Sequence, residues 1–100
     1  MVDDVTYRDK IIMAALHGVI EASSEPDGSI TVQVPTACDG LLAVVAMILE
    51  STPGCSDSVA MERASEKLGK DLLAHLLAMR GMAERTGRRP LDEAGVSRIG

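Results

Sequence analysis

The sequence predicts a mainly α-helical domain of three helices, with one short strand or extended arm between the first two, completed by dimerisation. Two segments space their apolar residues three and four apart, as amphipathic helices do, and they flank a third segment that is apolar all round. Ile30–Val34 alternates apolar and polar residues, as a half-buried strand does. The 100 residues suit one domain. We place it at residues 1–87, followed by a loosely ordered tail at residues 88–100.

The first helix is predicted from Asp4 or Thr6 to Ala22. Thr6 is placed to cap it, with Asp9 three residues later in a variant of the capping box. Residues at helical spacing form its buried stripe, namely Val5, Ile12, Ala15, Leu16 and Val19. The next segment, Glu25–Gly28, has Pro in its second position and Gly in its fourth, which suits a type I turn.

The strand Ile30–Val34 has no convincing partner elsewhere in the sequence, although buried backbone groups are nearly always hydrogen-bonded. Three arrangements are open. The segment is an extended surface arm, it pairs with its own copy in a second subunit, or it pairs with residues near the C-terminus such as Val96 to Ile99. We favour pairing between copies, because symmetric dimers are the commonest assemblies.

The central helix is predicted over Thr36–Thr52, with Thr36 as its cap and Asp39 in its first turn. No charged side chain lies between Gly40 and Glu50, so we expect this helix to be covered on every side. The uncharged run is shorter than the roughly 18 residues expected of a membrane span. We therefore predict no membrane segment here.

The last helix is predicted over Ser58–Thr86, with Ser56, Asp57 or Ser58 as its cap and Gly87 as its end. Its apolar side chains form one broad stripe, made of Met61, Ala64, Leu68, Leu72, Leu73, Leu76, Leu77, Met79 and Ala83. The remaining elements cover about three sides of the central helix. Because large exposed apolar patches are uncommon on soluble monomers, we predict a homodimer with the central or last helix at its interface.

Composition narrows the classes of function. The formal net charge is −5, and Tyr7 is the one aromatic residue. An acidic chain repels phosphate backbones, and a chain without aromatic platforms is poorly suited to stacking bases, so nucleic acid is a disfavoured partner. The first twenty residues contain charges throughout and no cleavage pattern, which favours a reduced, cytoplasmic setting.

Two cysteines are the candidates for covalent chemistry. Cys38 is predicted in the first turn of the central helix, where a helix N-terminus can activate a thiol, and Cys55 in the loop before the last helix. Free cysteine is also among the most buried residue types, and we favour a packing role for both. The two lie at opposite ends of the central helix, so an intramolecular disulfide is not expected.

Two helical pairs and one basic cluster are the other candidates. His17 with Glu21, and Asp71 with His75, have the four-residue spacing that can hold a metal or orient an imidazole, but two ligands do not make a metal site. We favour solvated ion pairs. Arginines also gather at the end of the last helix. They are Arg80, Arg85, Arg88 and Arg89. We favour a structural role, because cations near a helix C-terminus interact favourably with the helix dipole. The alternative is that they form a phosphate-binding patch.

The sequence therefore favours a small non-catalytic protein that associates with itself and serves as a protein-interaction or adaptor module. No catalytic, cofactor-binding or metal-ligating residue is assigned. The first alternative is a small dimeric transcriptional or nucleic-acid-associated regulator that uses the Arg80–Arg89 end. The second is a thiol-dependent enzyme that uses Cys38 or Cys55.

Overall fold

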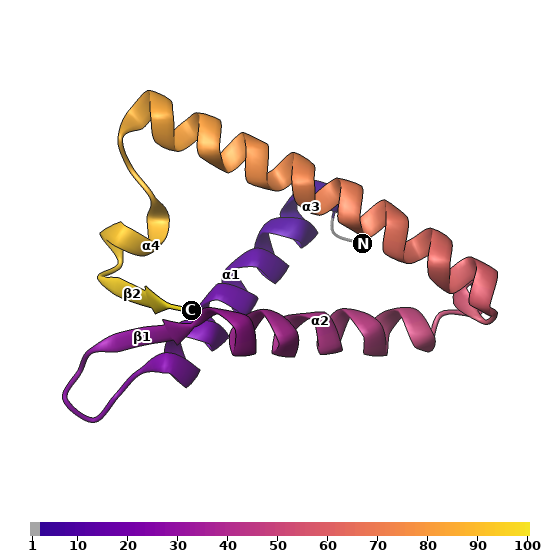
Figure 1. The fold of residues 1–100 in the computed structure, drawn as a ribbon, viewed down its shortest axis with the longest axis horizontal. Helices are drawn as coiled ribbons and strands as arrows, with labels where there is room; N and C mark the ends of the chain where they lie inside the picture. Colours follow the sequence, from indigo (N-terminus) through magenta and orange to yellow (C-terminus); the bar gives the residue numbers. More distant parts are fainter. Residues whose placement is uncertain (1–2) are drawn as a thin grey trace. The chain divides into compact units, whose positions relative to one another are not determined.

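A computed structural model describes residues 3–100 and is mainly helical (Figure 1). The chain divides into two compact units. The first comprises the chain up to Ala37 together with Leu91–Gly100, and the second comprises Cys38–Pro90. The predicted helical class is confirmed. Among residues 3–100, no helix combines the length and the hydropathy needed to cross a bilayer.

Helix α1 spans Asp4–Ser23, close to the predicted range. Its cap is Asp3 and not Thr6, because the Asp3 carboxylate accepts hydrogen bonds from the N–H and the hydroxyl of Thr6, both at 2.9 Å. These two bonds lower the pKa of Asp3 below its ordinary value. Of the predicted buried stripe, Leu16 and Val19 are half-buried. Val5 and Ile12 remain more than half exposed.

The predicted turn follows α1. The N–H of Gly28 donates to the carbonyl of Glu25 at 2.9 Å, and Gly28 has a φ of 88°, a conformation that glycine adopts without strain. Ser29 donates from both its hydroxyl and its N–H to the Asp27 carboxylate, at 2.6 and 2.9 Å. Both bonds lower the pKa of Asp27. The turn returns the chain, so that Ser24 and Ile30 form an antiparallel bridge.

Strand β1 spans Ile30–Gln33 and pairs in parallel with β2, Val96–Ile99, in the register Ile30↔Val96 to Gln33↔Ile99 (Figure 1). Of the three arrangements left open by the sequence, this is the pairing with C-terminal residues of the same chain, and not the favoured pairing between copies. The segment predicted as a tail contains two regular elements. It forms α4, Pro90–Glu93, and β2, where a loosely ordered segment is predicted.

The sheet supplies the small core of the first unit. Val32 and Val96 are 7% and 4% exposed, and α1 packs against β1. Arg98, on β2, forms an ion pair with Asp92 of α4. Two buried valines, one on each strand, therefore help to hold together segments that are more than sixty residues apart.

Helix α2 spans Val34–Glu50 and begins directly after β1, two residues earlier than the predicted cap Thr36. Pro35 therefore lies inside the first turn, where its missing N–H costs nothing, and Asp39 falls outside that turn. The helix ends where the hydroxyls of Ser51 and Thr52 donate to carbonyls of its last turn. A 3₁₀ turn, η1 (Pro53–Cys55), leads to the next helix.

Helix α3 spans Ser58–Thr86, as predicted. Of the three candidate caps, Asp57 is the one used, accepting from the N–H of Ala60 at 2.8 Å. Gly87 ends the helix with a φ of 69°, and its N–H donates to the carbonyl of Ala83 at 2.8 Å. Figure 1 shows α2 and α3 running away from η1 as separate helices, and they contact each other sparsely.

The prediction that α2 is covered on every side is wrong for the single chain. Within the described residues, none of the α2 side chains is buried. The physical reason is that α2 and α3 contact each other sparsely, so neither helix covers the apolar side chains of the other.

Candidate functional site

Both cysteines are free thiols in different surroundings. Cys38 is exposed and is the fifth residue of α2, because the helix begins earlier than predicted. Cys38 therefore lies beyond the first turn of α2, where a helix N-terminus would lower the pKa of a thiol and activate it. Cys55 is buried at 6% exposure in η1, which packs against α3. Its placement fits the packing role.

The two helical pairs differ from each other. Nε2 of His17 lies 3.9 Å from Oε2 of Glu21, with both side chains about four-fifths exposed. Asp71 instead accepts a hydrogen bond from Nζ of Lys67 at 2.9 Å. Among residues 3–100, no group of three or more His, Cys, Asp and Glu side chains is placed to hold a metal ion.

The arginines lie at and beyond the end of α3. Arg80, Arg85, Arg88 and Arg89 are all exposed. Nη1 of Arg85 lies 3.1 Å from the position of a Cβ built on Gly81, so its guanidinium folds back along the helix. Cations in this position complement the C-terminal end of the helix dipole.

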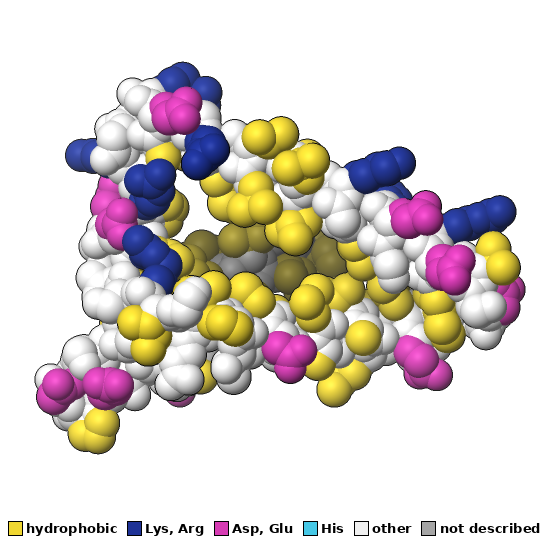
Figure 2. All heavy atoms as spheres, in the orientation of Figure 1, with side chains coloured by type: hydrophobic (Ala, Val, Ile, Leu, Met, Phe, Trp, Pro, Cys, Tyr) yellow, Lys and Arg dark blue, Asp and Glu magenta, His cyan; other side chains and the backbone are white. Residues whose placement is uncertain are grey.

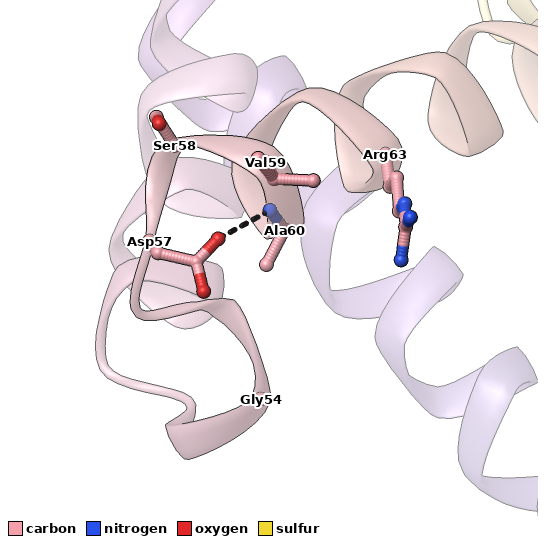
Figure 3. Close-up of a pocket in the computed structure, with 6 residues that line it drawn as sticks. All are labelled: Gly54, Asp57, Ser58, Val59, Ala60 and Arg63. Atoms are coloured by element: carbon pink, nitrogen blue, oxygen red, sulfur yellow. Dashed lines mark hydrogen bonds between the residues drawn. The ribbon is translucent and has the colours of Figure 1, made fainter.

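One hollow opens at the start of α3 (Figure 3). Its volume is about 410 Å³, and its lining consists of Gly54, Asp57, Ser58, Val59, Ala60 and Arg63. Figure 3 shows the Asp57 carboxylate directed at the N–H of Ala60, so that carboxylate already serves as the helix cap. The hollow is formed by the first turns of one helix and the segment that precedes it.

Exposed apolar surface is the largest chemical feature of the second unit. Figure 2 shows apolar side chains gathered along α2 and α3. Fourteen large ones are each 40–69% exposed. They are Leu41, Leu42, Val44, Met47 and Ile48 on α2, with Val59, Met61, Leu68, Leu72, Leu73, Leu76, Leu77, Met79 and Met82 on α3.

This surface has charged limits that sequence reasoning missed. On α2 the uncharged run is bounded by Asp39 and Glu50, which are both acidic. On α3 the run Leu72–Met79 is bounded by Asp71 and Arg80, with Lys70 next to Asp71. The signal was present in the spacing of these charges along each helix. The spacing of these charges helps to identify a binding surface only when both helices are known to be exposed.

Comparison with protein-family models, with curated proteins and with solved structures finds no match for this chain.

Proposed function

We propose that this protein is a small non-catalytic module that associates with itself through the exposed apolar faces of α2 and α3, and that it serves protein–protein interaction. The observation that carries the proposal is the set of fourteen half-exposed apolar side chains on these two helices. Large exposed apolar patches mark interaction sites in soluble proteins.

The energetics favour association. Burying a Val, Leu, Ile or Met side chain fully contributes about 1.5–3 kcal/mol, so covering the exposed half of one contributes about 1 kcal/mol. Covering most of the fourteen yields on the order of 10 kcal/mol. The loss of translational and rotational freedom on association costs about 4–15 kcal/mol. The free energy available from covering the apolar surface of α2 and α3 is therefore of the same size as that cost.

The first test uses thermal unfolding at several protein concentrations. Because the associated state is folded, mass action raises the midpoint as the chain concentration rises. We expect the midpoint, followed by circular dichroism at 222 nm, to climb by several degrees over a hundredfold range of concentration. A midpoint that is independent of concentration would contradict self-association.

A further inference from the structure

The α2 helix carries a face with acid at both ends. Asp39 and Glu50 are eleven residues apart, which places them on the same side of the helix and about 16 Å apart along its axis. Between them on that side lie Ala43 and Ala46, with Leu42 at the margin. We call this set the acidic-ended face. All five side chains are exposed.

The α3 helix carries a face of similar length with base at both ends. Lys70 and Arg80 are ten residues apart, or about 15 Å along the axis. Leu73 and Leu77 fall between them at three- and four-residue spacing and are 56% and 60% exposed. We call these four residues the basic-ended face. Leu73 and Leu77 protrude from it, whereas Ala43 and Ala46 leave room on the acidic-ended face.

The two faces complement each other in length, charge and shape. Because both ends of one are acidic and both ends of the other are basic, either helix direction brings opposite charges together. Within the described residues, no side chain forms an ion pair with Asp39, Glu50, Lys70 or Arg80. Small residues opposite leucines let two helices approach closely.

Within one chain, the acidic-ended face of α2 cannot align with the basic-ended face of α3. The η1 turn ties the end of α2 to the start of α3, so a closed hairpin would set Glu50 opposite Ser58, twelve residues before Lys70. In such a hairpin Asp39 alone would come near Lys70, and Arg80 would lie beyond the beginning of α2. The α3 helix has 29 residues against 17 for α2, and the part that α2 cannot reach contains Leu77 and Arg80 of the basic-ended face.

We propose that the acidic-ended face of α2 in one copy binds the basic-ended face of α3 in a second copy, and that the second copy returns the same contact. Such a reciprocal contact closes a symmetric dimer with four helices at its centre. This inference rests on the self-association proposed above and names the surfaces that meet.

The test reverses the charges of one face at a time. One variant carries Lys70→Glu and Arg80→Glu, and the other carries Asp39→Lys and Glu50→Lys. Each alone places like charges at both ends of both contacts, so we expect its dissociation constant to rise roughly tenfold to a hundredfold. Mixing the two variants restores opposite charges in both contacts. We therefore expect a heterodimer of native affinity, read by native mass spectrometry with one variant isotope-labelled.

A matched control carries Arg8→Glu and Lys10→Glu on α1. It changes the net charge as the Lys70 and Arg80 variant does, and we expect native association. If every variant associates as the native chain does, the named faces are wrong while self-association stands. If mixing fails to restore association, the two faces do not meet between copies, and the inference is overturned. A native chain that stays monomeric overturns this inference and the proposed function together.

Discussion

Replacing Val96 by Asp is expected to unfold the small parallel sheet and lower the free energy of unfolding by about 2–4 kcal/mol. Val96 is 4% exposed, and it lies beside Ile30 in the register of β1 and β2. A carboxylate in that position would lose its hydration without gaining a partner. The change removes an apolar contact that joins β2 to β1 within the first unit.

The control for Val96 is its neighbour. Ser97→Asp changes an exposed side chain on the opposite face of the same strand. We expect it to shift the unfolding free energy by no more than about 0.5 kcal/mol. Urea denaturation of the two variants measures the difference. Equal effects of the two substitutions would show that Val96 is not part of a core.

Replacing both Leu73 and Leu77 by Asp is expected to weaken self-association by at least about a hundredfold. The two substitutions remove apolar area worth about 1 kcal/mol each, and they add two charges that must be desolvated on binding. A hundredfold change corresponds to about 2.7 kcal/mol, which these two terms together supply. Sedimentation equilibrium measures the dissociation constant directly.

A second pair of substitutions on the same helix is the control for Leu73 and Leu77. Val59 and Met61 are 55% and 43% exposed and lie in the first turns of α3, away from the basic-ended face. Asp at these two positions suits the helix dipole, so the fold is retained. We expect association within a few-fold of native. Native association of the Leu73 and Leu77 variant would remove these leucines from the interface.

The local signals of α3 predicted its bounds because they agree with one another. Asp57 caps the helix, apolar residues recur at helical spacing along it, and Gly87 supplies the left-handed conformation that ends it. Each of these features acts within a few residues, so the sequence alone is enough to place them. The Glu25–Gly28 turn was predictable for the same reason.

The sequence named Val96 to Ile99 as one possible partner for the strand but did not favour it over pairing between copies. Val96–Ile99 is short, and its pairing with β1 depends on segments more than sixty residues apart. A parallel pair requires a crossover, so no turn signal announces it. The start of α2 was also misplaced. Pro35 resembles the end of a strand in sequence, yet it is equally suited to the first turn of a helix.

The exposure of α2 shows a different limit of sequence reasoning. Its composition predicts that it needs cover, and the structure of one chain does not provide that cover. Periodicity identifies which side chains need to be buried, but it does not identify the molecule that buries them. The proposed occupant is inferred from charged residues near the ends of the apolar runs, Asp39 with Glu50 on α2 and Lys70 with Arg80 on α3.

We propose that a second copy of the chain covers the apolar faces of α2 and α3. Static light scattering coupled to size-exclusion chromatography tests it most directly, over concentrations from micromolar to millimolar. We predict a mass near twice 10.5 kDa that falls toward 10.5 kDa on dilution. A mass of 10.5 kDa at every concentration up to millimolar would contradict the account.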